Sequence, residues 1–189
     1  MLQRRITNEP DEVVIARSVA DGFADLAAQV DREGSFPFRQ VAALHDKGLL
    51  ALTAPRALAG GGAGLELAAR VIAEIGRGDP AVALILVMQY AHLAGLDQGR
   101  WPQNLVREVV RSAVEDGALI NALRVEPALG SPSRGGLPET VARRDGDGWR
   151  LSGHKLYSTG IPALRWLAVW ARTDEPAPRV GVFLVPRDR

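Results

Sequence analysis

The sequence has no cysteine, which excludes a disulfide framework and a catalytic thiolate. Its three histidines, His45, His92 and His154, are scattered without the spacing of metal ligands. An excess of one charge is also missing, because 23 basic and 22 acidic residues nearly cancel and no basic block could hold a phosphate backbone. The longest apolar run, Ala81 to Met88, is far shorter than the ~20 residues of a membrane span, and the N-terminus has no apolar signal segment. We therefore expect a cytoplasmic protein with no metal, no nucleic-acid partner and no membrane partner.

The 189 residues are 47% hydrophobic, which is enough to bury an ordinary core. Up to about Gly117 the apolar residues recur in steps of three and four, which predicts helices. Asp79 and Pro80 are a good N-cap and first-turn pair for an apolar helix that we expect to be central and buried all round. Asn104 is the expected N-cap of the last helix. The predicted helices cover 10–31, 35–51, 65–77, 81–93 and 105–114.

After Gly117 the pattern changes to short β-like runs separated by Gly, Pro and Asp. Asp145 to Gly148, with the sequence DGDG, predicts a hairpin turn because Asp-Gly favours positive φ. A helical block at 1–117 followed by a strand block at 118–189 predicts an α+β protein of two domains. The expected strands lie in 118–125, 139–144, 149–159, 166–173 and 180–186.

The glycine-rich stretch from Ala59 to Gly64, AGGGAG, has two interpretations. A phosphate cradle would need a following Gly-Lys-Ser/Thr or a G-x-G-x-x-G spacing, and neither is present. We therefore favour a flexible turn between two packed helices. His92 is expected to be a satisfied core histidine, and His45 to be solvated.

Two segments of the β-rich half could bind a ligand. Glu126-Pro127 opens the loop 128–132, which either is a simple turn or offers backbone amides and the Ser131 hydroxyl to a polar ligand edge. The stretch GHKLYSTG, residues 153–160, either is an ordinary strand with Tyr157 half buried or presents that ring to an aromatic cofactor, with Thr159 as a hydroxyl donor. Each simple interpretation is favoured alone, but two such segments about 30 residues apart in one domain strengthen the ligand interpretation.

These two segments resemble a known family, the acyl-CoA dehydrogenases and their flavin monooxygenase relatives. VEPALGSP, residues 125–132, is similar to the family's T-E-P-x-x-G-S-D loop, and KLYSTG, residues 155–160, to its G-x-K-x-F/W-I-T-N strand. Phe36-Pro37, Gly48-Leu49-Leu50 and the stretch from Pro55 to Gly64 also match in the expected order, so the resemblance covers nearly the whole chain.

The resemblance implies a helical N-terminal domain, a β-barrel-like middle domain, and FAD or, in some relatives, FMN. It implies that the flavin-binding residues are Leu123, Arg124, Val125, Ser131, Tyr157, Ser158 and Thr159. Ser131 is also expected to face the substrate, an acyl-CoA or another small organic molecule. The family continues with a C-terminal helical bundle that carries the catalytic base, so we assign no catalytic residue and expect an incomplete middle domain. We expect a homo-oligomer or a partner that supplies the bundle.

The sequence departs from the family pattern at three positions. Val125 stands where the family usually has Thr, Pro132 replaces the usual Asp, and Gly160 the usual Asn. The Y-S-T-G form resembles the monooxygenase-like branch more than the dehydrogenases of fatty acyl-CoA. The leading hypothesis is the flavin-binding portion of an acyl-CoA dehydrogenase-like oxidoreductase acting on CH–CH groups. The alternatives are a flavin-dependent monooxygenase-like protein and a non-catalytic truncated remnant that acts as an interaction module.

Overall fold

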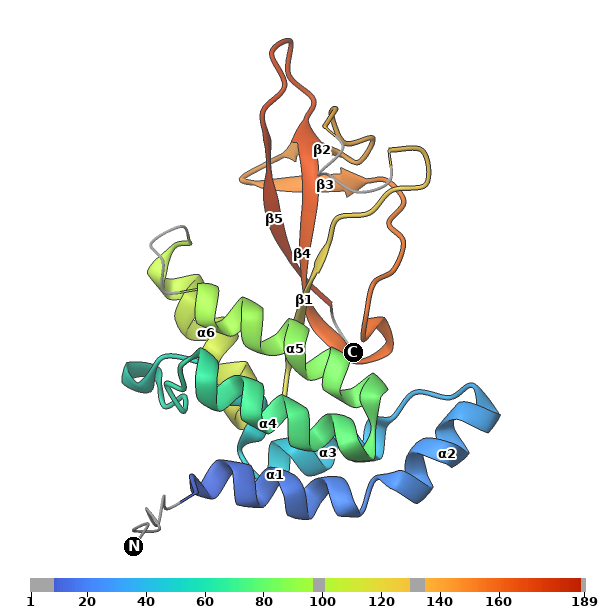
Figure 1. Ribbon diagram of the computed structural model, residues 1–189. Helices are drawn as coiled ribbons and strands as arrows, with labels where there is room; N and C mark the ends of the chain where they lie inside the picture. Colours follow the sequence, from blue (N-terminus) through green and yellow to red (C-terminus); the bar gives the residue numbers. More distant parts are fainter. Residues whose placement is uncertain (1–8, 97–100, 130–134, 188–189) are drawn as a thin grey trace, which may run out of the picture. The chain divides into compact units, whose positions relative to one another are not determined.

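The computed structural model describes residues 9–96, 101–129 and 135–187. The chain forms two compact units, Met1–Gly117 and Ala118–Arg189 (Figure 1). The first is helical and the second is built on a sheet, so the α+β prediction is confirmed. The helices of the first unit are α1 (Asp11–Asp21), α2 (Ala24–Glu33), α3 (Phe38–Asp46), α4 (Leu65–Gly78), α5 (Pro80–Gly95) and α6 (Gln103–Glu115), with short 3-10 turns η1 (Leu49–Ala51) and η2 (Arg56–Leu58).

The predicted first helix is wrong in one respect, because it is two helices that meet at Gly22 and Phe23. The amides of these two residues donate to the carbonyls of Val19 and Ala20 in a tight turn. The turn places the Phe23 side chain in the core, where it is 3% exposed. Burial of this large ring therefore outweighs the continuous helical pattern around it.

The predicted second helix also breaks. Helix α3 ends at Asp46, and Gly48 follows with φ +70°, a left-handed conformation that ends a helix and that glycine adopts at little cost. The residues after it form η1 as a separate turn, with Leu49 and Leu50 buried. His45, near the end of α3, is not solvated as expected. Its Nε2 lies 3.0 Å from the Val114 carbonyl, which ties α3 to α6.

Asp79 caps α5 as predicted, since its carboxylate accepts hydrogen bonds from the amides of Ala81 and Val82 at 3.0 and 3.1 Å. The prediction that this helix is buried on all sides is wrong for one face, where Leu84 is 52% exposed. The predicted cap of α6 is also wrong. Pro102 precedes the first turn, and Asn104 lies inside that turn without capping it. Within the described chain, no helix is both long enough and apolar enough to cross a membrane.

The glycine-rich stretch is a turn, as favoured, but it is tied down rather than flexible. Four of its amides donate to carbonyls of the segment just before it, so they are not available to a phosphate. A Cβ at Gly60 would collide with the backbone of Ala54, which explains why glycine stands there. The four bonds run from Gly60 to Pro55, Gly61 to Ala51, Gly62 to Ala54 and Ala63 to Leu52, at 2.9–3.1 Å.

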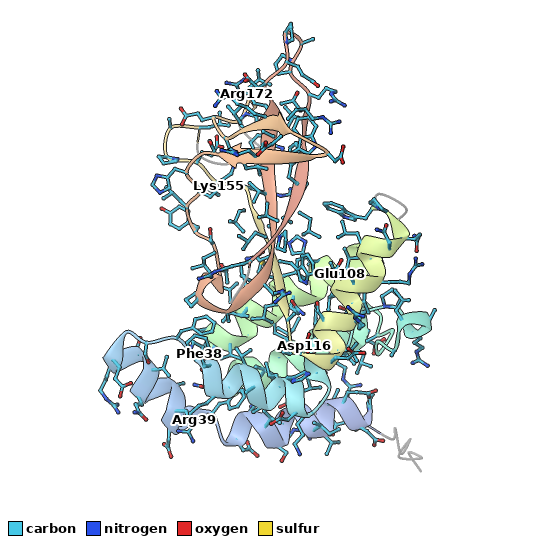
Figure 2. All side chains as sticks on the ribbon, turned by 180° about the vertical axis from the view of Figure 1, so that it is seen from behind. Phe38, Arg39, Glu108, Asp116, Lys155 and Arg172 are labelled. Atoms are coloured by element: carbon cyan, nitrogen blue, oxygen red, sulfur yellow. The ribbon has the colours of Figure 1, made fainter. Side chains whose placement is uncertain are left out.

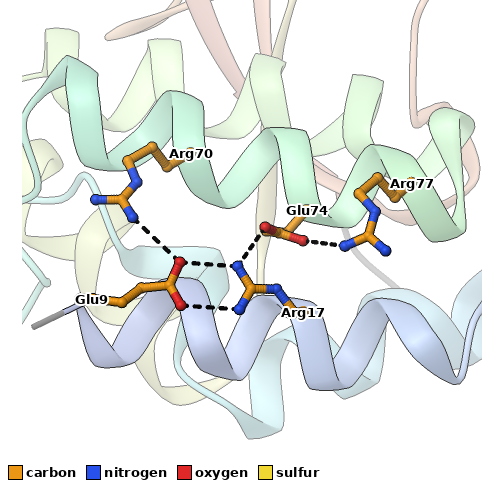
Figure 3. A network of polar contacts seen from close by, with 5 residues as sticks. All are labelled: Glu9, Arg17, Arg70, Glu74 and Arg77. Carbon is orange, nitrogen blue, oxygen red and sulfur yellow. Dashed lines mark hydrogen bonds and ion pairs between the residues drawn. The ribbon is translucent and has the colours of Figure 1, made fainter.

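Helix α1 packs against α4, and an ion-pair network runs along the outside of this contact (Figure 3). Arg17 of α1 bonds Glu9 at 2.9 Å and Glu74 of α4 at 2.8 Å. Glu74 also pairs with Arg77, and Arg70 reaches Glu9. Because most of these side chains are accessible to solvent, the network contributes little to the free energy of unfolding, and added salt weakens that contribution.

The second unit contains a mixed sheet (Figure 1). The central strand β4 pairs with β1 in parallel, with β5 antiparallel, and near its end with β2 in parallel, and β3 continues from β2. The predicted hairpin at Asp145–Gly148 is confirmed and joins β2 to β3, with Gly146 at φ +59°. The strands are β1 (Leu119–Leu123), β2 (Val141–Asp145), β3 (Gly148–Ser152), β4 (Leu164–Thr173) and β5 (Val180–Pro186).

The predicted strand 149–159 is wrong beyond Ser152, where β3 ends. Gly153 passes so close to Thr140 that a Cβ there would collide with the Thr140 backbone and hydroxyl. The chain then leaves the ladder, and Leu156 forms an isolated bridge with Val125 outside the named strands. The stretch 153–160 is therefore a shaped connection between β3 and the turn η4 (Ile161–Ala163), which precedes β4.

Candidate functional site

The structure brings the two predicted segments together. Val125 and Leu156 form an antiparallel bridge, in which the Leu156 amide donates to the Val125 carbonyl at 2.9 Å. A second contact joins the two parts of the chain, because the side-chain amide of Asn121 donates to the Thr159 carbonyl, also at 2.9 Å. Asn121 is 3% exposed, so this bond is shielded from water. Two stretches about 30 residues apart in sequence therefore share one surface of the second unit.

Tyr157 does not lie half buried in a strand, as the simple interpretation required. Its side chain is 84% exposed and its φ is +54°. A left-handed conformation costs a residue with a Cβ about 1–2 kcal/mol, and such strain persists where the surrounding structure enforces it. Thr159 donates its amide to the Tyr157 carbonyl at 2.9 Å, which closes a tight turn that begins at Tyr157 and is centred on Ser158. The aromatic ring is thus held out from the sheet by its own backbone.

The hydroxyls of Ser158 and Thr159 follow directly and make no hydrogen bond with any residue that the structure describes, although neither side chain is fully exposed. Neither hydroxyl is among the buried unpaired atoms of the described chain, so water can reach both and a bound ligand could take the place of that water. An exposed ring and two unpaired hydroxyls on one tight turn form a surface that matches an aromatic ligand with a polar edge.

The predicted cofactor residues occupy different depths. Leu123 is 7% exposed at the end of β1, Val125 is half buried and Arg124 is exposed. Ser131, the predicted substrate contact, lies outside the described residues, as does Pro132. An open pocket of about 340 Å³ adjoins the two segments. It is lined by Leu123, Thr140, Leu151, Gly153, Lys155, Ser158, Ile161, Val169 and Val185.

Residue patterns alone did not indicate the buried ion pair beside this surface. The Lys155 ammonium (labelled in Figure 2) lies 2.7 Å from Glu126 Oε1, with side-chain exposures of 7% and 0%. Burial alone would raise the pKa of Glu126, but hydrogen bonds from Lys155, the Thr140 hydroxyl and the amides of Glu139 and Thr140 outweigh it and hold that pKa at about 2. The signal that could have revealed the pair is that both residues fall inside the two motifs.

These features meet what a flavin requires of a protein surface. An isoalloxazine offers a flat aromatic face and an edge of carbonyl and ring-nitrogen atoms, and the turn at Tyr157 presents a ring beside two hydroxyl donors. The pocket adds an apolar wall with a few polar groups, the usual composition of a cofactor site. In the described part of the chain, no cluster of His, Asp and Glu could hold a metal ion in its place.

Comparisons with known proteins identify the relatives of the chain. Residues 14–98 match the family model described as acyl-CoA dehydrogenase, N-terminal domain. The human mitochondrial short-chain specific acyl-CoA dehydrogenase is 35% identical over 168 residues, which are 85% of this chain and 39% of that protein. The resemblance to the acyl-CoA dehydrogenases is therefore confirmed, and the chain is related to them.

Solved structures agree with the fold. KijD3 in complex with FMN and a dTDP-linked amino sugar has a TM-score of 0.82 and 27% identity, over 96% of this chain and 46% of that one. FMN-bound TdsC from Paenibacillus sp. A11-2, a dibenzothiophene monooxygenase, has a TM-score of 0.82 at 22% identity, over 95% of this chain and 45% of that one. The chain thus spans less than half of the length of the proteins it matches.

Proposed function

We propose that this relative of the acyl-CoA dehydrogenases is the flavin-binding portion of an oxidoreductase. The observation that carries the proposal is the turn at Tyr157, which combines an 84% exposed ring, a left-handed backbone and two neighbouring hydroxyls that no described residue satisfies. This combination leaves a flat ring and two hydroxyl donors accessible on one strained turn, where a ligand with an aromatic face and a polar edge can contact all three. The similarity to acyl-CoA dehydrogenases and to a structure that holds FMN supports a flavin as the ligand.

The residues divide the work of holding the flavin. Tyr157 packs its ring on the isoalloxazine, while Ser158 and Thr159 donate hydroxyl hydrogen bonds to the polar edge. The segment from Leu123 to Val125 supplies backbone contacts from the facing side, and Ser131 remains the proposed contact to the substrate. The resemblance to acyl-CoA dehydrogenases favours FAD, and KijD3 shows FMN on a similar fold.

When bound, the flavin would supply the hydride-accepting chemistry for a CH–CH group of an acyl-CoA or another small organic substrate. The chain's own contribution is to bind, orient and shield that ring. Glu126 is not a candidate for proton removal, because its two oxygens accept four hydrogen bonds and its pKa of about 2 is far from that of a base working near neutrality. The resemblance to the acyl-CoA dehydrogenases assigns the base instead to a companion segment or a second polypeptide.

The test is a flavin titration of the purified chain, alone and mixed with the part of the human short-chain acyl-CoA dehydrogenase that lies beyond the match. We expect binding of FAD or FMN in the mixture, seen as a shift in flavin absorbance, and weaker binding by the chain alone. Tyr157→Ala should lower the affinity about fivefold, since loss of an aromatic contact is worth roughly 1 kcal/mol. Phe38→Ala is the matched control, because Phe38 is an exposed aromatic of the first unit (Figure 2).

Three outcomes would overturn the proposal: no uptake of either flavin in the mixture, equal affinity of the Tyr157→Ala variant, or an equal loss from Phe38→Ala. If the chain takes up no flavin but associates with other proteins through exposed apolar surface, the interaction-module alternative replaces it.

A monooxygenase-like activity is the second candidate, motivated by the Y-S-T-G form. Gly160 adopts φ +81°, so the residue that replaces the family's usual Asn still supports the turn. The two activities differ in their use of O₂ by the reduced flavin. If the flavin-loaded mixture transfers oxygen to an organic substrate and leaves a saturated acyl-CoA unchanged, the monooxygenase candidate is correct.

A further inference from the structure

The buried ion pair of Glu126 and Lys155 connects three parts of the second unit. The Lys155 ammonium donates to Glu126 at 2.7 Å and to the Trp170 carbonyl of β4 at 2.6 Å, and it lies 5.5 Å from the centre of the Trp170 ring. Glu126 directly follows Val125, and Lys155 comes two residues before Tyr157. The pair therefore lies immediately behind both segments of the proposed flavin surface.

Glu126 has no freedom to move in this arrangement. Its Oε2 accepts the Glu139 amide at 2.7 Å, and its Oε1 accepts the Thr140 amide at 2.9 Å and the Thr140 hydroxyl at 2.6 Å, in addition to Lys155. A carboxylate with these donors keeps a single rotamer and orientation. Glu126 therefore gives the Lys155 ammonium a fixed position, and with it the segment of chain that carries Lys155.

The direct contact between the two segments is slight by comparison. It consists of the isolated Val125–Leu156 bridge and the bond from Asn121 to the Thr159 carbonyl. The bridge joins the two backbones at one point, and the buried pair adds a second connection between the residues next to it, Glu126 and Lys155. The pair therefore restricts rotation and separation of the two segments about the bridge.

We propose that Glu126 and Lys155 are positioning residues, which hold the Tyr157 turn at the correct distance from the segment 123–125 for the flavin. The inference rests on the proposed function. A buried ion pair is a costly way to gain stability, because well-packed apolar residues often do as well, so its presence behind this surface indicates a requirement for geometry.

The test uses the full chain with a double variant, Glu126→Gln with Lys155→Met, which removes both charges and leaves neither one unpaired. We expect cooperative unfolding to persist, the Leu156 amide to exchange with solvent at least about tenfold faster, and flavin affinity to fall about tenfold or more. The matched control is Asp145→Asn with Arg150→Met, an ion pair of the same unit that is exposed. This control should change neither quantity.

A second variant, Lys155→Arg, covers the case in which the double variant does not fold. It keeps the charge balance, but a forked guanidinium cannot hold Glu126 and the Trp170 carbonyl at the spacing of an ammonium. We expect faster Leu156 exchange and at least about threefold weaker flavin binding, with unfolding at nearly the same urea concentration. Wild-type values of both quantities in whichever of the two variants folds would overturn the inference. Amide exchange is measured without flavin, so a wild-type chain that binds no flavin refutes the proposed function separately.

Discussion

The two tyrosines of the chain show how the two units differ. Tyr90 in the helical unit is 3% exposed, its hydroxyl donates to the Leu49 carbonyl at 2.7 Å, and burial raises its pKa. Tyr157 in the sheet unit is 84% exposed on a left-handed turn. The first unit uses its aromatic hydroxyl to complete its own packing, whereas the second holds its ring outward. The helical unit therefore buries its tyrosine as part of its core, whereas the sheet unit leaves its tyrosine accessible at the surface that we propose to bind the flavin.

The largest expected difference between the units is in the chemical modification of their tyrosines. Tetranitromethane nitrates exposed tyrosines, so we expect modification of Tyr157 and none of Tyr90, whose side chain is 3% exposed. Peptide mass spectrometry after brief treatment measures this. Bound flavin should protect Tyr157 if the proposed function is correct. Equal modification of both tyrosines would contradict the contrast between the units.

The next largest effect is expected from Lys155→Met. The variant leaves Glu126 as an uncompensated buried charge, a change that typically costs about 3–5 kcal/mol. In a Trp101→Phe background, used for all the urea experiments, the three remaining tryptophans lie in the second unit, so their fluorescence reports its unfolding, while far-ultraviolet circular dichroism reports the helical unit. Only the fluorescence transition should move to lower urea. Arg150→Met, which removes one partner of an exposed pair, should leave both transitions nearly unchanged.

We expect acid to destabilise the second unit through the Glu126 carboxylate, in a way that salt does not change. The folded pKa of Glu126, about 2, lies below the ordinary value of about 4.3, so its ionised form stabilises the second unit above that value. This stabilisation is lost as the pH falls from about 4.3 toward 2. Added salt should not prevent the loss, because the pair is buried. In the first unit Glu9 and Glu74 also have lowered pKa values, chiefly through hydrogen bonds from Arg17, and there salt should suppress the acid effect.

A smaller effect, confined to the first unit, is expected from Asp79→Ala. Asp79 accepts two amides at the start of α5 and is 3% exposed, and the loss of such a cap costs about 1–2 kcal/mol. The dichroism transition should shift while the tryptophan transition stays. Asp116→Ala is the control, since Asp116 follows the C-terminal end of α6, where a negative charge is unfavourable (Figure 2).

The smallest effect should come from Arg17→Met, at the centre of the surface network in Figure 3. Exposed ion pairs contribute little and are screened by salt. We expect a small decrease in the urea midpoint of the first unit at low ionic strength and no difference from wild type at 1 M salt. A decrease that persists at high salt would mean that Arg17 acts through packing of its apolar stem.

Several elements could be predicted because their signals are local. The periodic pattern behind Gly64 predicts α4, the Asp79-Pro80 pair marks the start of α5, and DGDG specifies the hairpin at 145–148. The break at Gly22 could not be predicted in this way. It depends on the burial of Phe23, a contact with distant residues that outweighs the continuous local pattern.

The residues of the site were also partly visible in the sequence. The motifs indicated Leu123 to Val125 and Tyr157 to Thr159 as one ligand surface, and assigned a role to neither Glu126 nor Lys155 beneath it. The pair is 29 residues apart, and residue spacing alone does not show which charges a sheet will bury together. The early end of β3 at Ser152 is similar, because it follows from the close approach of Gly153 to Thr140.

The sequence by itself determined the composition class, the division into a helical and a strand-rich part, and the two segments that we propose to contact the flavin, because these depend on residue type and short-range patterns. Only the tertiary structure decided that Tyr157 faces outward at φ +54°, that Leu156 bridges to Val125, and that a buried lysine pairs with Glu126 behind them. Those features arise where distant segments compete for the same space and the same hydrogen-bond donors. Their geometry is therefore a property of the folded chain.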